Sequence, residues 1–167
     1  MQMGNASAAP WWAGKRGEWY VLAQAGLFLL VVLGPRTAPW LPAWPGFAPR
    51  VWPVLGLVLM SAGFLWVVAG AAQMGSSLTA LPCPKRGGTL IDSGAFAFVR
   101  HPMYCGGIWV AVGLALYTQG LLTLLNAVVL AAFFDVKATR EERWLVAAFP
   151  GYAAYRKRVP KLIPFLY

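Results

Sequence analysis

The sequence predicts an all-α integral membrane protein with about four transmembrane helices and a helical C-terminal extension in the cytoplasm. Three observations predict it. Of the 167 residues, 59% are hydrophobic and only 11% are charged, whereas soluble domains average about 45–50% apolar and about 25% charged residues. The apolar residues form four long segments. The basic residues, which give a net charge of +9, are concentrated on one side of the topology that these segments imply.

The four apolar segments are candidates for membrane-spanning helices, which need roughly 17–25 residues each. The second segment, at about 51–74, is long enough, whereas the first (about 19–34) and the third (about 103–118) are short and would tilt little or thin the bilayer. The fourth begins near Leu121 and continues past Asp135. We do not expect the first segment to be a cleaved signal peptide, because it is long for one and no small-residue cleavage site follows it.

The segments between these helices are distinct in composition. Six prolines and three tryptophans fall within 35–53, which predicts an irregular loop at the outer membrane interface. Glycines and prolines within 75–94 predict a cytoplasmic loop. Neither residue type occurs between Leu121 and Phe149, so a helix of about 40 Å at 1.5 Å per residue is expected, with its last turns in the cytoplasm. Residues 152–158 predict one more short amphipathic helix.

Charge predicts the orientation in the membrane. The short uncharged link at 117–120 makes segments three and four a helical hairpin, whose open ends lie on one side. Threading the chain back puts only Arg36 and Arg50 on the opposite side, and the positive-inside rule then places both termini in the cytoplasm. The basic residues on that side are Lys15, Arg16, Lys85, Arg86, Arg100, Lys137, Arg140, Arg143, Arg156, Lys157, Arg158 and Lys161.

Topology and attraction to anionic head groups account for this charge, so the sequence does not call for a nucleic-acid partner. A single histidine excludes a His-rich metal site, and no metal is expected. We treat 1–167 as one domain, and no segment indicates a particular oligomeric state.

The first polar cluster surrounds the predicted start of segment three at Pro102, a residue favoured in the first turn of a helix. The free N–H groups there, together with the planar fork of Arg100, suit a carboxylate such as that of an amino-acid-like ligand. Alternatively, Arg100 and His101 anchor the chain at the head groups. Gly106 and Gly107 follow one turn later and would allow either close helix packing or contact with a flat ligand.

The second cluster lies near the end of the fourth segment, where Glu141 and Glu142 follow Lys137 and Arg140. Adjacent residues on a helix point about 100° apart, so one glutamate can face inward while the other meets solvent. A solvated charged surface is one interpretation. The hairpin, however, returns this helix to the side of Arg100, where a carboxylate could accept ribose hydroxyls or a neighbouring cation.

Both clusters resemble a known family. The sequence resembles the isoprenylcysteine carboxyl methyltransferase and phospholipid methyltransferase superfamily over roughly 75–167. The matching runs are Gly88-Thr89-Leu90-Ile91-Asp92-Ser93-Gly94-Ala95-Phe96, Val99-Arg100-His101-Pro102-Met103-Tyr104-Cys105-Gly106, Glu141-Glu142-Arg143-Trp144-Leu145, Phe149-Pro150-Gly151-Tyr152, Tyr155 and Arg158-Val159-Pro160-Lys161-Leu162-Ile163-Pro164.

The resemblance implies an integral membrane enzyme that transfers a methyl group from S-adenosylmethionine to a lipid-like or membrane-partitioned acceptor. It implies a cofactor site within 85–167 at the cytoplasmic face. The residues implied to bind the cofactor are Arg100, His101, Pro102, Tyr104, Gly106, Glu141 and Glu142. The chain departs from the family at Lys137, where an arginine is common, and a lysine cannot make the same planar fork.

The nature of the methyl acceptor stays open at this point. A carboxylate acceptor would be desolvated beside Arg140 or Lys137, whereas an amine acceptor would lose a proton to Glu141, Glu142 or His101. Two other functions are kept as alternatives. One is a sterol-reductase-like enzyme that binds NADPH through Lys85-Arg86 or Arg156-Lys157-Arg158, and the other is an accessory membrane protein without activity.

Overall fold

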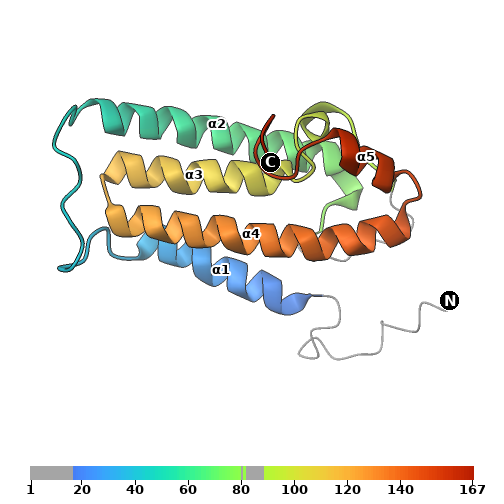
Figure 1. The fold of residues 1–167 in the computed structure, drawn as a ribbon, viewed down its shortest axis with the longest axis horizontal. Helices are drawn as coiled ribbons and strands as arrows, with labels where there is room; N and C mark the ends of the chain where they lie inside the picture. Colours follow the sequence, from blue (N-terminus) through green and yellow to red (C-terminus); the bar gives the residue numbers. More distant parts are fainter. Residues whose placement is uncertain (1–16, 80, 82–88) are drawn as a thin grey trace.

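The computed structural model describes residues 17–79, 81 and 89–167. Over these residues the chain forms α-helices and two short 3₁₀ turns, with no strand, as the sequence predicted. Four long helices lie lengthwise side by side, and α5 packs at one end of them (Figure 1). Their bounds are α1 Glu18–Leu33, α2 Val51–Met74, α3 Pro102–Thr118, α4 Leu121–Ala148 and α5 Tyr152–Arg158. The predictions made for Lys15, Arg16, Lys85 and Arg86 lie outside the described residues.

Proline and glycine punctuate the helices as the sequence predicted. Helix α3 has Pro102 at its first position, α4 runs without interruption to Ala148, and α5 starts directly after Gly151. The predicted irregular loop is slightly shorter than expected, because α2 already begins at Val51 and includes Pro53. A proline is tolerated in the first turn, where the missing N–H has no partner within the helix.

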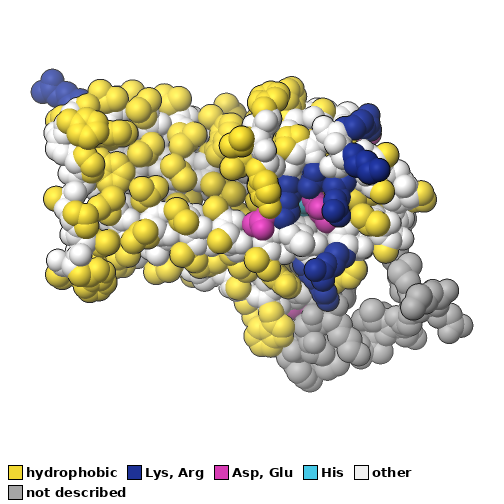
Figure 2. Space-filling view, in the orientation of Figure 1, with side chains coloured by type: hydrophobic (Ala, Val, Ile, Leu, Met, Phe, Trp, Pro, Cys, Tyr) yellow, Lys and Arg dark blue, Asp and Glu magenta, His cyan; other side chains and the backbone are white. Residues whose placement is uncertain are grey.

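The outer surface of the bundle is that of an integral membrane protein. Helices α2 and α4 are long and apolar enough to cross a bilayer, whereas α1 and α3 have 16 and 17 residues. Large apolar side chains of α2, such as Val58, Phe64 and Leu65, are exposed. Hydrophobic side chains cover most of the face in Figure 2, and Lys and Arg side chains gather at one end. Hydrocarbon is the environment that such a surface fits.

Helices α2 and α3 meet along a seam of glycines, which we call the glycine seam. Gly56, Gly63 and Gly70 recur every seven residues on α2, and all three are buried. Gly63 faces Gly106 of α3 and Gly56 faces Gly113, so the two backbones approach with no side chain between them. Small residues allow this close packing inside membranes.

A hydrophobic core joins the other helices. Val31 of α1, Ala111 of α3, and Ala127, Leu130 and Phe134 of α4 form one buried cluster. Helix α1 packs mainly against α4, whereas α2 packs against α3. The α3–α4 hairpin is therefore the centre of the bundle, and its open end carries both polar clusters.

Candidate active site

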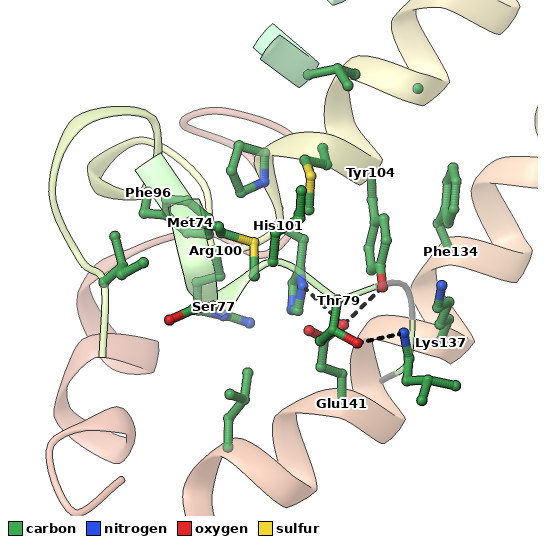
Figure 3. Close-up of a pocket in the computed structure, with 18 of the residues that line it drawn as sticks. Met74, Ser77, Thr79, Phe96, Arg100, His101, Tyr104, Phe134, Lys137 and Glu141 are labelled. Atoms are coloured by element: carbon green, nitrogen blue, oxygen red, sulfur yellow. Dashed lines mark hydrogen bonds and ion pairs between the residues drawn. The ribbon is translucent and has the colours of Figure 1, made fainter. Parts of the chain in front are cut away.

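A cavity of about 640 Å³ lies at the end of the bundle where the basic residues gather. Helices α1 to α4, α5 and the loop before α3 all contribute to its wall. Figure 3 shows His101, Tyr104, Lys137 and Glu141 converging in it. One part of the cavity wall is polar, and its side chains are Gln24, Arg100, His101, Tyr104, Lys137 and Glu141. The wall continues between the helices with apolar side chains, which include Phe28, Phe64, Val67, Val110 and Phe134.

Two backbone hydrogen bonds to the C-terminal segment fix the start of α3. The N–H of Arg100 donates to the carbonyl of Pro160 at 2.9 Å, and the N–H of His101 donates to the carbonyl of Lys161 at 3.2 Å. His101 is the N-cap residue, and α3 starts at the next position. These two bonds place the side chains of Arg100 and His101 against the end of α4.

A stack of three rings organises the polar part of the cavity. The His101 ring lies parallel to that of Tyr104 with 5.4 Å between centroids, and Tyr104 lies parallel to Phe134 at 4.7 Å. The Tyr104 hydroxyl donates to Glu141 Oε2 at 2.8 Å. The Lys137 ammonium is 5.1 Å from the centre of the Tyr104 ring and also donates to Gln24 of α1. Glu141 and Lys137 therefore both face the cavity with defined orientations.

Glu142 is buried behind the cavity in a network of cations. Arg100 Nε donates to its Oε1 at 2.7 Å, and His101 Nε2 lies 3.3 Å from the same oxygen. Arg156 Nε is 3.8 Å from the other oxygen. Arg100 Nη1 donates to the carbonyls of Arg156 and Val159. Two of the three guanidinium nitrogens of Arg100 are thus already engaged, in bonds that tie Glu142 to the C-terminal segment.

The structure brings together most of the residues predicted for the site. Arg100, His101, Pro102, Tyr104, Lys137 and Glu141 line the cavity. Glu142 does not line it but contacts Arg100 and His101, which do.

Two predicted residues lie elsewhere. Arg140 is on the exposed side of α4, with its guanidinium 5.1 Å from the centre of the Trp144 ring. The cause is helical geometry, because Arg140 directly precedes Glu141 and adjacent residues on a helix point about 100° apart. Gly106 faces Gly63 in the glycine seam, so the packing interpretation holds for it, and it is Gly107 that lines the cavity.

Sequence analysis missed several residues of the cavity wall. Gln24 and Phe28 come from α1, far from both clusters in sequence, and no motif marks them. Tyr152 and Tyr155 of α5 belong to the run that resembles the family, which was a usable signal. The Tyr155 hydroxyl donates to the carbonyl of Phe96 at 2.6 Å.

Tyr152 is the one lining residue here whose buried hydroxyl lacks a hydrogen-bond partner within the described part of the chain. Its side chain is buried, with 2% of the residue exposed. Burial raises the pKa of the Tyr152 hydroxyl, and the nearby Glu142 carboxylate raises it further. The group is therefore protonated at neutral pH and can donate to a ligand in the cavity. An unpaired buried hydroxyl costs about 1–3 kcal/mol, so a ligand that accepts from it gains that amount.

Within residues 17–79, 81 and 89–167, no three His, Cys, Asp or Glu side chains come together so as to hold a metal ion.

Comparison with known families gives a match over most of the membrane bundle. The sequence model of the phospholipid methyltransferase family matches residues 51–151, which is more than half of the chain. This range includes α2, α3, α4 and both polar clusters.

Similar proteins include two kinds of curated relative. The protein-S-isoprenylcysteine O-methyltransferase of Schizosaccharomyces pombe is 42% identical over 103 residues, which cover 56% of this chain and 42% of the relative. The human protein of the same name is 28% identical, covering 74% of this chain and 45% of the relative. The cobalt-zinc-cadmium resistance protein CzcN of Cupriavidus metallidurans is 27% identical, covering 90% of this chain and 63% of the relative. The chain thus spans about half the length of the relatives that it matches.

A solved structure shares the fold. The eukaryotic intramembrane Ras methyltransferase ICMT (isoprenylcysteine carboxyl methyltransferase) superposes with a TM-score of 0.65 at 22% identity, covering 91% of this chain and 54% of that chain.

Proposed function

Because the chain belongs to the phospholipid methyltransferase family, we propose that it is a membrane methyltransferase that uses S-adenosylmethionine and acts on a lipophilic acceptor. The observation that carries the proposal is the cavity itself. It combines a polar part, built from the predicted cluster residues, with an apolar wall that extends between the helices. A polar methyl donor and an apolar acceptor need those two environments side by side.

The residues present fit S-adenosylmethionine. The cavity volume of about 640 Å³ lies within the range of about 300–1,000 Å³ that is usual for small-molecule sites. The unpaired Tyr152 hydroxyl and the Glu141 carboxylate suit the ribose and amino groups, and the parallel rings of His101 and Tyr104 offer a flat surface. When bound, the cofactor supplies an electrophilic methyl group on a sulfonium centre.

The protein's own contribution is to orient the reactants and to exclude water, and orientation alone lowers a barrier by several kcal/mol. Tyr104 fixes Glu141 through a 2.8 Å hydrogen bond, so this carboxylate has one defined direction in the cavity. Glu141 is the residue placed to take a proton from an amine acceptor. Lys137 is the cation placed beside a carboxylate acceptor, and Arg140 is too far round α4 for that task.

Arg100 and Glu142 act mainly as positioning residues in this proposal. Arg100 lines the cavity, and in this proposal its remaining nitrogen binds the carboxylate of the cofactor. Its other nitrogens hold Glu142 and the carbonyls of 156 and 159.

For the membrane topology, we propose four crossings with both termini in the cytoplasm. Helices α1 and α3 would span about 24–26 Å at 1.5 Å per residue, slightly less than a hydrocarbon core of about 30 Å. Support comes from their alignment beside α2 and α4 (Figure 1). Protease added outside sealed cells should leave both ends intact, and cleavage at either end would overturn this topology.

One of the two basic runs considered for the reductase alternative, Arg156-Lys157-Arg158, lines a second cavity and not the first, so it does not offer a phosphate site in the first cavity. The other run, Lys85-Arg86, lies outside the described residues.

The first experiment is a thermal unfolding measurement on the detergent-purified protein with S-adenosylhomocysteine or with NADPH. A ligand at 100 times its Kd adds about 2.7 kcal/mol. Stabilisation by S-adenosylhomocysteine alone is expected, and stabilisation by NADPH alone would replace the proposal by a reductase. Incorporation of labelled methyl groups into a lipophilic acceptor then separates an enzyme from an accessory protein, which would bind without turnover.

A further inference from the structure

A second cavity, which we call the outer groove, lies on the surface side of the Arg100–Glu142 pair. Its volume is about 630 Å³, and the end of α4, α5 and the segment after α5 form it. Its cationic side chains are Arg100, Arg143, Arg156, Lys157, Arg158 and Lys161. Glu142 also lines it, but Arg100 compensates that charge at 2.7 Å. Lys161 is bound to Asp135 and Thr139. Four exposed cations, at 143 and 156–158, thus remain to attract an anion.

The outer groove lies where the surface changes from basic to apolar. Leu166 lines it and is 80% exposed, and the adjacent Phe165 is 88% exposed. In Figure 2 the Lys and Arg side chains gather directly beside the hydrophobic surface of the bundle. Exposed apolar side chains beside cations are typical of the depth in the membrane at which lipid head groups meet acyl chains.

An exposed apolar stripe on α4 leads into the outer groove. Leu125, Val129 and Val136 are each about half exposed and lie on one face of the helix. The same face continues to Thr139 and Arg143, which line the groove. The twelve residues from Leu125 to Val136 cover about 16 Å along the helix axis, which is about the thickness of one leaflet of a hydrocarbon core of about 30 Å.

We propose that the outer groove binds an anionic phospholipid, with its phosphate among the cations and an acyl chain along the α4 stripe. Positive charge alone would accept any anion, but the stripe beneath it selects one that carries a chain. The site is separate from the cavity where methyl transfer is proposed, and the inference does not depend on that activity.

The lipid site is coupled to the inner cavity by shared residues. Arg100 lines both cavities, and Arg156 lies 3.8 Å from Glu142. A phosphate in the outer groove therefore draws on the same cations that hold Glu142 in place.

Native mass spectrometry of the delipidated full chain tests the proposal. Phosphatidylglycerol and phosphatidylcholine with identical acyl chains are added separately. One phosphatidylglycerol is expected to bind at least tenfold more tightly than phosphatidylcholine. The variant Arg143→Gln should lower the affinity for phosphatidylglycerol about fivefold, and Arg143→Gln with Arg158→Gln about thirtyfold, since each basic residue near the surface contributes about one fivefold factor.

The matched control is Arg50→Gln, which removes one exposed positive charge at the start of α2, at the opposite end of the bundle from the outer groove. This variant should leave the affinity for phosphatidylglycerol unchanged. Unchanged melting temperatures would show that all three variants are folded. Equal binding of both lipids, or unchanged phosphatidylglycerol binding in the double variant, would overturn the proposal. Displacement of the lipid by an equal concentration of glycerol 3-phosphate would also overturn it, because the groove would then be a site for a free phosphate ester.

Discussion

Replacing Gly63 by alanine would insert a methyl group into the glycine seam. The new Cβ would lie 2.6 Å from the carbonyl oxygen of Gly106 and 2.9 Å from the backbone nitrogen of Val110. Both are backbone atoms of α3, so neither can rotate away. To reach an ordinary contact of 3.4 Å from 2.6 Å, the helices would have to separate by about 0.8 Å.

The expected loss of stability follows from two opposing effects. Overpacking of this kind costs about 1–3 kcal/mol, and alanine regains up to about 1 kcal/mol over glycine in a helix interior. Gly26→Ala in α1 is the matched control, because nothing lies within 4 Å of its added Cβ. It makes the same chemical change and gains only the helix propensity. The two variants should therefore differ by about 1–3 kcal/mol.

Thermal unfolding of both variants in one detergent measures this difference. For a chain of this size, 1 kcal/mol corresponds to about 2–4 °C, so Gly63→Ala should melt about 2–12 °C below Gly26→Ala. Its affinity for S-adenosylhomocysteine should also fall, because α3 carries Tyr104 into the cavity. Equal melting temperatures would refute the close seam and reopen Gly106 as a ligand contact.

Three further predictions concern the cavity. Glu142→Gln leaves the buried Arg100 without its carboxylate partner, so it should lower the free energy of unfolding by about 3–5 kcal/mol. It should also weaken S-adenosylhomocysteine binding measured by calorimetry, and a normal affinity would contradict the positioning role of Glu142. Tyr152→Phe removes an unpaired hydroxyl, so the free protein should melt at the same or a higher temperature while S-adenosylhomocysteine binds more weakly; unaltered binding would remove Tyr152 from the site. Lys137→Arg should raise turnover of carboxylate acceptors and not of amines, because the planar fork grips a carboxylate with two bonds; unchanged or lower turnover would argue against carboxylates.

The helix limits were predictable because strong local signals set them. Pro102 starts α3, Pro150 follows the end of α4, and both effects operate within one turn. The meeting of the two polar clusters was also predictable, because the short link after Thr118 forces a hairpin. Each inference needed only neighbouring residues and the length of a helix.

The functions of single residues within the clusters were harder to predict. The partners of Arg100 include the backbone carbonyls of 156 and 159, which no side-chain pattern reveals. Lys137 meets Gln24 from 113 positions earlier in the chain. The exposed position of Arg140 could have been anticipated, since Arg140 directly precedes Glu141 and adjacent residues on a helix point about 100° apart. The seven-residue glycine spacing shared by α2 and α3 was likewise visible and indicates packing.

The pairing of the start of α3 with the C-terminal segment has a consequence for how the protein is made. Arg100 donates a hydrogen bond to the carbonyl of Val159, which is 59 positions later in the chain. At about 5–20 residues per second, the ribosome makes these two residues about 3–12 seconds apart. Throughout that interval the nascent helices can insert, but the cavity has no far wall and Glu142 lacks Arg156. The cofactor binding proposed for this cavity can therefore begin only after residue 161 has been synthesised, so a bound cofactor would indicate that the chain had been made at least to that residue.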